Sequence, residues 1–472
     1  MESRQGGIEM MRRQLSCLGA ALALAWSGLW GAGCAAPVED ASPRGEALGA
    51  RPGGPHAGWG HALPRDEAAG VTRTVIAGDI VEYATELRVG PGEYDRIGIH
   101  RVVRERAPWR PIRARDGVMF VHGSASTFRS AAAPGLFAPD LFEDDFGLAP
   151  HLASQGIDVW GIDLRWTFVP VEETDFSDMQ GWTLGSHVED LRRATAIARS
   201  VRAASGSGRG RLFFSGHSLG ADIALAYANA ETQRPPGHRD VRGLIPIDII
   251  YKLTSPQTQG LRDDAAARYA ANRALYDAGT YEFGLGAQLA PLIGAGLSAP
   301  SDPSPLAPGW TNLQAATAVF TNTYLFYAPL PAYTPHYHFS AGVFDPSTGA
   351  PVGCQHVDAI DMLQVAQRFP PYQALIEAVE IDALISGAVD VPYDDHLHEV
   401  TVPVLHVGAA GGFGAAGAET LSLLGSTDTT AHIVQLQPPG AEVVDYGHVD
   451  LLWAADSEAL VWQPIADWIA TR

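Results

Sequence analysis

The strongest chemical signal in this 472-residue chain is the pentapeptide Gly216-His217-Ser218-Leu219-Gly220. An apolar, strand-like run at 212–214 precedes it, and a helical pattern at 219–230 follows it. This strand-turn-helix setting is typical of a nucleophile elbow, in which a sharp turn presents the serine hydroxyl and glycines leave room for the crowded backbone. The N-terminus of the helix directs free N–H groups toward developing negative charge. We therefore predict that Ser218 is a nucleophile.

Two other segments could supply the partners of such a serine. His448 is preceded by glycine and lies between the last strand-like and the last helical segment, so it is the candidate general base. Far upstream, the strand-like run 118–121 ends at His122-Gly123-Ser124. The backbone N–H groups of Leu219 and Ser124 are predicted to form an oxyanion hole. In the expected reaction His448 accepts the proton of the serine as it attacks an ester carbonyl.

Alternating strand and helix patterns place these segments on a common scaffold. Period-two stretches at 80–87 and 97–103 flank a Gly-Pro-Gly turn and predict an antiparallel pair at a sheet edge. Apolar runs then alternate with helical stretches: strands are expected at 118–121, 159–162, 212–214, 244–247, 402–407 and 433–436, and helices at 148–155, 187–201, 219–230 and 459–470. This rhythm predicts an α/β fold with a mostly parallel sheet and helices on both faces.

The rhythm breaks between residues 251 and 399. This region is rich in proline, alanine, glycine and aromatic residues, with helical pieces at 261–277 and 361–386. An insertion at the carboxyl edge of an open α/β sheet overhangs the place where ligands bind. We expect a cap or lid at 251–399, between a first core part at 71–250 and a second at 400–472.

Taken together, the Gly-His-Ser-Leu-Gly elbow, the His-Gly at 122–123 and the segment Tyr446-Gly447-His448-Val449-Asp450-Leu451 resemble the α/β-hydrolase family, in particular its esterase and lipase branch. The resemblance covers about 80–250 and 400–472, and it includes Asp163-Leu164-Arg165 after a strand. It implies an α/β-hydrolase sheet with a large cap insertion, and a Ser-His-acid triad that cleaves carboxylic esters through an acyl-enzyme without a cofactor. The dehalogenase and epoxide-hydrolase branches need Asp at the elbow, so they are excluded.

The acid of the triad stays open. Many family members carry it after the strand that corresponds to 402–407, but here the following loop, Gly408-Ala409-Ala410-Gly411-Gly412-Phe413-Gly414, contains no carboxylate. We rank Asp248 first, because it directly follows the run 244–247, a position that some lipases of the family use. Asp428 and Glu419 are the alternatives.

Substrate and reaction are less well defined than the nucleophile. Most aromatic residues of the insertion are expected in the cap core and a few at the site, which favours a small-molecule ester with an apolar group; they are Trp310, Tyr324, Phe326, Tyr327, Tyr333, Tyr337 and Phe339. The same fold could serve a peptidase, thioesterase, acyltransferase or polyester hydrolase. The acid-free loop is the one feature that favours a non-catalytic surface binding module.

The N-terminus reads as a targeting segment. Two arginines precede an apolar run from Leu15 to Trp30, which predicts a signal peptide over 1–34. The segment Gly31-Ala32-Gly33-Cys34 resembles the lipobox of bacterial lipoproteins, which implies membrane anchoring through a lipidated Cys34; ordinary cleavage near Ala35 or Ala36 is the alternative. Residues 35–70 are predicted to be a flexible leader. The protein is therefore expected to be exported, as a cell-envelope lipoprotein or a secreted protein.

Composition excludes several other functions. Acidic residues outnumber basic ones 53 to 32, a formal charge of −21, so nucleic acid is not an expected partner. The three cysteines show no zinc spacing. Two acidic stretches, 141–145 and 394–399, are expected to be solvated loops rather than metal sites, and no cofactor is predicted.

Overall fold

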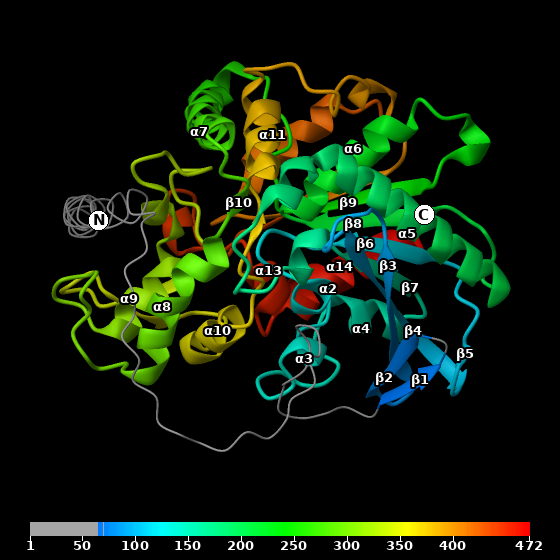
Figure 1. Cartoon of the computed structure of the whole chain (residues 1–472), viewed down its shortest axis with the longest axis horizontal. Coiled ribbons are helices and arrows are strands. Elements are labelled where there is room, and N and C mark those ends of the chain that lie inside the picture. The colour runs from blue at the N-terminus through cyan, green and yellow to red at the C-terminus, as the bar shows by residue number, and fades with distance from the viewer. Residues whose placement is uncertain (1–64, 69) are drawn as a thin grey trace.

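A computed structural model of the chain describes residues 65–68 and 70–472 (Figure 1). The predicted signal peptide, Cys34 and all but the last residues of the predicted leader lie outside the described residues. Eleven strands form one sheet in the order β1-β2-β3-β4-β7-β6-β8-β9-β14-β15, with β5 beside β4. Their bounds are β1 Arg65–Ala68, β2 Val71–Ala77, β3 Ile80–Arg88, β4 Arg96–Ala107, β5 Arg110–Pro111, β6 Gly117–Val121, β7 Asp158–Asp163, β8 Leu212–His217, β9 Val241–Ile247, β14 Val404–Ala409 and β15 Thr429–Val434.

The part of the sheet from β7 to β15 is parallel throughout. Every residue of β6 and of β8 is buried, as the continuous apolar runs predict for strands covered on both faces. Alternate residues of β6 enter two different cores: Val118 and Phe120 join one, and Met119 and Val121 join the other. The predicted α/β class with a mostly parallel sheet is confirmed.

The antiparallel part of the sheet is larger than predicted. β3 and β4 pair as expected, but β1 and β2 extend the sheet beyond them, so β3 and β4 are not at the edge. β1 begins at Arg65, inside the segment 35–70 that we expected to be a leader. Strand pairing uses main-chain hydrogen bonds, which can form without the apolar period on which the prediction depended.

Helices cover both faces of the sheet (Figure 1). The core helices are α2 Phe128–Ala132, α3 Pro134–Phe137, α4 Leu148–Ser154, α5 Leu184–Ala204, α6 Leu219–Glu231, α12 Gly414–Ala418, α13 Asp450–Trp453 and α14 Gln463–Ala470. α5 and α6 pack on one face, and α4 and α14 on the other. α6 follows β8 directly, which places the elbow at the carboxyl edge of the parallel strands.

A helical insertion lies between β9 and β14, which are neighbours in the sheet. Its helices are α7 Gln259–Asp277, α8 Leu285–Ser298, α9 Asn312–Thr321, α10 Ala359–Ala366 and α11 Leu375–Ser386. It also contains two small antiparallel sheets, one of β10 Glu282–Phe283 and β13 Gln373–Ala374, the other a hairpin of β11 Gly342–Phe344 and β12 Pro351–Cys354. α7 packs on α11, and α8 packs on α9 and α10, which gives two groups at one end of the molecule (Figure 1). The helical piece expected at 361–386 is two helices, because Pro370 and Pro371 interrupt it.

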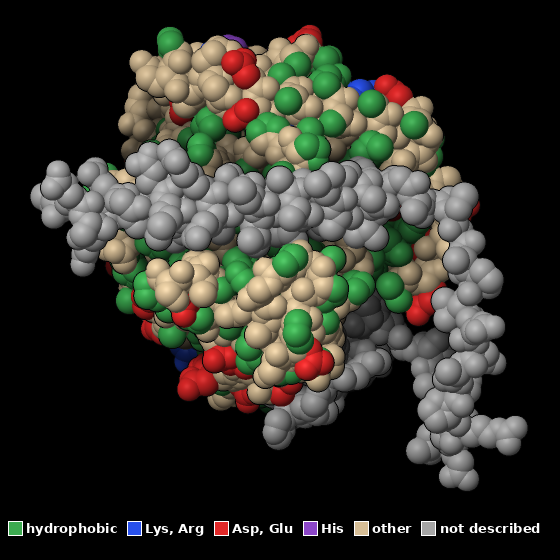
Figure 2. All heavy atoms as spheres, turned by 90° about the vertical axis from the view of Figure 1, so that its left-hand side faces the viewer, with side chains coloured by type: hydrophobic (Ala, Val, Ile, Leu, Met, Phe, Trp, Pro, Cys, Tyr) green, Lys and Arg blue, Asp and Glu red, His purple; other side chains and the backbone are tan. Residues whose placement is uncertain are grey.

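The visible part of the cap face displays more acidic than basic side chains, in line with the acidic composition (Figure 2). Across 65–68 and 70–472, no helix has both the length and the apolar character needed to cross a membrane.

Candidate active site

Ser218 occupies a strained turn between β8 and α6. Its backbone has φ 54° and ψ −129°, a conformation that residues other than glycine rarely adopt. A Cβ on Gly216 would overlap the carbonyl of Gly220, and a Cβ on Gly220 would overlap the carbonyl oxygen of Val121 in β6. Both glycines are therefore required by the close approach of α6 to the strands. Ser218 is partly exposed, and its hydroxyl is hydrogen-bonded to none of the described residues.

Backbone strain concentrates around this turn. In the described part of the chain, four residues other than glycine have positive φ, and three of them are Ser218, Asp248 at 45° and Ala125 at 52°. Ser218 and Ala125 line the same pocket, and Asp248 lies behind His448. Strained residues persist where the surrounding structure holds them, and they cluster at functional sites.

His448 and Asp248 are paired. His448 Nδ1 lies 2.6 Å from Asp248 Oδ2, and both side chains are buried. The imidazole of His448 also lines the pocket beside Ser218, and its ring centroid is 4.2 Å from that of His217, the residue before the serine. The structure thus brings together the three residues that head the predicted triad.

The acid-free loop after β14 holds Asp248. Its backbone N–H groups donate to Asp248 Oδ1 from Ala409 at 2.9 Å, Phe413 at 3.2 Å and Gly414 at 3.4 Å. A Cβ on Gly412 would overlap Asp248 Oδ2, so only glycine lets the loop approach this closely. The loop that contributes no carboxylate therefore binds the carboxylate that follows β9.

The two alternative acids have other partners. Asp428 pairs with Arg472 at 2.7 Å. Glu419 accepts backbone hydrogen bonds from Thr254 at 2.6 Å and Ser255 at 2.7 Å. Neither is hydrogen-bonded to His448, which makes Asp248 the acid that the geometry favours.

The segment that carries His448 is fastened to the cap. His448 N donates to His338 O at 2.9 Å. Asp450, two residues further on, accepts from Ser340 Oγ at 2.6 Å, Ala341 N at 2.8 Å and Gly447 N at 2.8 Å. Although Asp450 lay in a motif that we quoted, the sequence did not indicate this role. Its carboxylate fixes the turn before α13 against a stretch of the insertion.

The predicted oxyanion residues also lie beside Ser218. A Cβ on Gly123 would be 2.9 Å from Ser218 Cβ, so the loop that ends at Ser124 passes directly over the serine. His122 braces this loop, because its Nε2 accepts from Leu164 N at 3.0 Å while its Nδ1 donates to Gly123 O at 2.9 Å. Burial lowers the pKa of His122 to about 4, which keeps the imidazole in the neutral form that this pattern needs.

Leu219 N belongs to the first residue of α6 and has no acceptor within the helix. Its free N–H group and the neighbouring 122–124 loop lie on either side of the serine. Ser124 and Leu219, the two residues predicted to form the oxyanion hole, both line the pocket that contains Ser218.

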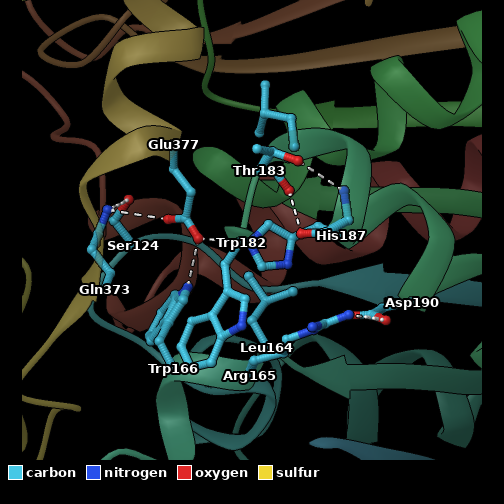
Figure 3. Close-up of polar contacts among 12 residues, drawn as sticks. Ser124, Leu164, Arg165, Trp166, Trp182, Thr183, His187, Asp190, Gln373 and Glu377 are labelled. Atoms are coloured by element: carbon cyan, nitrogen blue, oxygen red, sulfur yellow. Dashed lines mark hydrogen bonds and ion pairs between the residues drawn. The ribbon is translucent and has the colours of Figure 1, made fainter. Parts of the chain in front are cut away.

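A buried polar cluster connects the cap to this loop (Figure 3). Gln373, just before α11, directs its Nε2 toward Ser124 Oγ at 3.4 Å. One turn along, Glu377 accepts from Trp166 Nε1 at 3.0 Å and lies 2.6 Å from His187 Nε2. Burial raises the pKa of Glu377, and His187 opposes that shift. Sequence reasoning missed Gln373 and Glu377, since no local pattern marks a contact across 249 residues.

Ser218, His448, Leu219 and Ser124 open into one pocket of about 560 Å³ between the sheet edge and the cap. Apolar and aromatic side chains dominate its lining. More of the cap aromatics reach it than we expected: Phe326, Tyr327, Tyr333, Tyr337 and Phe339 line the pocket. An apolar lining of this kind lowers the local dielectric constant, which strengthens electrostatic stabilisation of a developing oxyanion.

The acidic stretch at 394–399 forms local ion pairs. Asp394 pairs with Lys252, and His396 Nδ1 lies 3.1 Å from Glu399 Oε1. Within the described ranges, no three His, Cys, Asp or Glu side chains are grouped so that they could hold a metal ion.

No protein-family model matches the chain, and no curated protein matches it. Solved structures do. A candidate lipase from Sulfolobus solfataricus is 17% identical, and the match covers 83% of this chain and 95% of that one with a TM-score of 0.54. A monoglyceride lipase from Saccharomyces cerevisiae, in complex with a substrate analogue, is 12% identical over 88% and 96% of the two chains, with a TM-score of 0.40.

The thioesterase domain of the curacin biosynthetic pathway is 13% identical over 82% and 99% of the two chains, with a TM-score of 0.35. At these identities the similarity shows the fold alone. Of the three structures, the Sulfolobus one, with its TM-score of 0.54, supports that conclusion. The predicted α/β-hydrolase fold is thereby confirmed.

Proposed function

We propose that this protein is a serine hydrolase that cleaves carboxylic esters through an acyl-enzyme, with Ser218 as nucleophile, His448 as general base and Asp248 as the orienting acid. The observation that carries the proposal is the 2.6 Å contact between His448 Nδ1 and Asp248 Oδ2, next to a serine on a strained elbow in the same pocket. A buried carboxylate on Nδ1 selects the tautomer that leaves Nε2 free to accept the serine proton.

The steps follow from these positions. Ser218 Oγ forms a bond to the ester carbonyl carbon as its proton passes to His448 Nε2, a hydrogen bond that closes when substrate is bound. The N–H groups of Leu219 and Ser124 stabilise the negative carbonyl oxygen. His448 then returns the proton to the departing alkoxide, and a water molecule hydrolyses the acyl-enzyme by the same sequence of transfers.

We further propose export of the protein, with anchoring through a lipidated Cys34 or cleavage near Ala35 or Ala36. Support for this comes from the basic and apolar pattern of residues 1–34 alone. A metabolic label for protein lipidation, lost in Cys34→Ala, would distinguish the anchored from the secreted form.

Replacement of the nucleophile tests the reaction. Ser218→Ala should lower kcat on a chromogenic short-chain ester by about 10⁶-fold, as loss of a triad serine does elsewhere. A fluorophosphonate probe should label wild type and fail to label the variant. The matched control is Ser200→Ala on α5, whose hydroxyl bonds only to Ala196 O of its own helix; its kcat should stay within about twofold, as is usual for an exposed surface change. Comparable activity in Ser218→Ala would overturn the proposal.

A further inference from the structure

One wall of the pocket carries a polar side chain that the proposed reaction does not use. Asp222 lies four residues after Ser218 in α6, so it is about 6 Å further along the same face of the helix. Asp222 is fully buried and lines the pocket. Neither of its carboxyl oxygens has a hydrogen-bond partner among the described residues. Buried polar groups are nearly always paired, so this one requires an explanation.

Asp382, the charged residue that acts on Asp222, is already paired with Arg268. Arg268 of α7 donates from Nε to Asp382 Oδ1 of α11 at 2.9 Å, and from Nη1 to the backbone oxygens of Pro331 and Ala332. Its guanidinium lies over the ring of Tyr333, 4.2 Å from the centroid. The Arg268–Asp382 pair thus balances its own charge and leaves Asp222 without a cation.

Two more polar groups of this wall are unengaged. Tyr327 and Tyr333 line the pocket beside the Arg268–Asp382 pair, and their hydroxyls form no hydrogen bond with any residue that the structure describes. The opposite wall, from α8, α9 and α13, is apolar, with Leu289, Ile293, Val319, Phe320 and Leu452. The pocket therefore has one hydrocarbon wall and one wall with unsatisfied hydrogen-bonding groups.

The chemistry of the polar wall identifies the group that it fits. Burial, with the nearby Asp382, raises the pKa of Asp222 well above its usual range and so favours the neutral acid. A neutral carboxyl presents one donor and one acceptor, as does an alcohol hydroxyl. A substrate cation would instead lie in the same pocket as the guanidinium of Arg268, and this like charge disfavours it.

We propose that Asp222, together with the hydroxyls of Tyr327 and Tyr333, forms a polar subsite that binds a hydroxyl group of the ester substrate. The apolar wall then holds the hydrocarbon part. This inference rests on the proposed function and deepens it, since it defines the substrate class as hydroxyl-bearing esters of an otherwise apolar compound.

Four esters test the subsite: butyl hexanoate, 4-hydroxybutyl hexanoate, butyl 6-hydroxyhexanoate and 4-ammoniobutyl hexanoate, with acid release followed by titration. In wild type, kcat/KM for one of the two hydroxylated esters should exceed that for butyl hexanoate by about tenfold or more, because a site built for a hydroxyl discriminates against its absence. Asp222→Leu should abolish this ratio. Asp222→Asn should retain part of it, since an amide also donates and accepts.

Glu231→Gln is the matched control, because Glu231 is a buried acid of the same helix outside the pocket; it should leave the ratio unchanged. The melting temperature gives a second readout. Asp222→Leu should raise it, since the variant removes an unpaired buried polar group, whereas a structural acid would lower it.

An equal ratio in wild type and Asp222→Leu, or a preference for the ammonium ester over both hydroxylated esters, would overturn the subsite. Calorimetric binding of the same esters to Ser218→Ala measures the preference without turnover. If no ester is hydrolysed, the proposed function fails; if hydrolysis depends on Ser218 but the ratio does not depend on Asp222, only the subsite fails.

Discussion

At the scale of single residues, the site depends on a carboxylate that is held from all sides. Asp248 accepts backbone hydrogen bonds from residues 409, 413 and 414 and contacts His448 at 2.6 Å. Its own backbone is strained, at φ 45°. Such support keeps the acid in one orientation, and the acid in turn determines which nitrogen of His448 carries the proton.

Asp248→Asn should therefore lower kcat by about 10³–10⁴-fold, because an amide favours the wrong tautomer of His448. Asp428→Asn and Glu419→Gln serve as controls and should stay within about twofold, because these acids bind elsewhere. Steady-state kinetics on one chromogenic ester compares all three variants. A loss of activity in Asp428→Asn with none in Asp248→Asn would reassign the acid.

At the scale of elements, the glycines of the loop after β14 allow its backbone to come close to side chains after β9 and in the insertion. Gly412 faces the Asp248 carboxylate, and Gly411 faces the ring of His338 from the cap, so neither position has room for a Cβ. The loop thereby joins β9, β14 and the insertion. A side chain here would move the acid rather than remove it.

Gly412→Ala should lower kcat by about 10²-fold or more, the usual cost of displacing a catalytic group by about 1 Å. Gly353→Ala is the matched control, since nothing lies within 4 Å of a Cβ at that position in β12. Far-ultraviolet circular dichroism and the melting temperature of both variants separate misplacement of the acid from unfolding. Full activity in a folded Gly412→Ala would contradict the close approach of the loop.

At the scale of the whole molecule, a buried charge network joins the antiparallel strands to the active-site side of the sheet. His100 of β4 lies 2.8 Å from Glu82 of β3 and 2.9 Å from Asp163 of β7, and Glu82 also pairs with Arg129 of α2. Burial alone would lower the pKa of His100, but Asp163 and Glu82 outweigh it and raise the pKa to about 9. His100 is therefore an imidazolium that holds three strands and a helix together.

This network should make stability depend on pH. The folded pKa of His100, about 9, exceeds the unfolded value of about 6.5. The contribution of His100 to the free energy of unfolding is therefore complete below pH 6.5 and is lost as pH rises through 9. Urea unfolding should show that the free energy of unfolding of the wild type falls by on the order of 3 kcal/mol between pH 6.5 and 9.5.

His100→Gln should show little of that loss, since its side chain does not titrate. Parallel pH profiles for wild type and His100→Gln would show that the network does not bind a proton on folding.

Much of the fold and part of the candidate site could be predicted from local signals in the sequence. Strands 118–121 and 212–214 and the helix after Ser218 were predictable because periodicity and glycine turns are encoded in adjacent residues. β1 was not predicted, and α10 and α11 were predicted as one helical piece. Pairing of β1 depends on the neighbouring β2, whereas the break was marked in the sequence by Pro370-Pro371 and was overlooked.

The amino-acid sequence by itself determined the α/β framework and singled out Ser218 and His448 as candidates for nucleophile and base, since each of these signals depends on residues that are close together along the chain. Only the tertiary structure decided among Asp248, Asp428 and Glu419, and only it revealed the roles of Asp450, Gln373 and Asp222. Those roles depend on distances across 100 residues or more, or on the absence of a partner. These long-range contacts, and the missing partner of Asp222 among the described residues, arise when the insertion packs over the sheet edge. No local sequence pattern therefore indicates them.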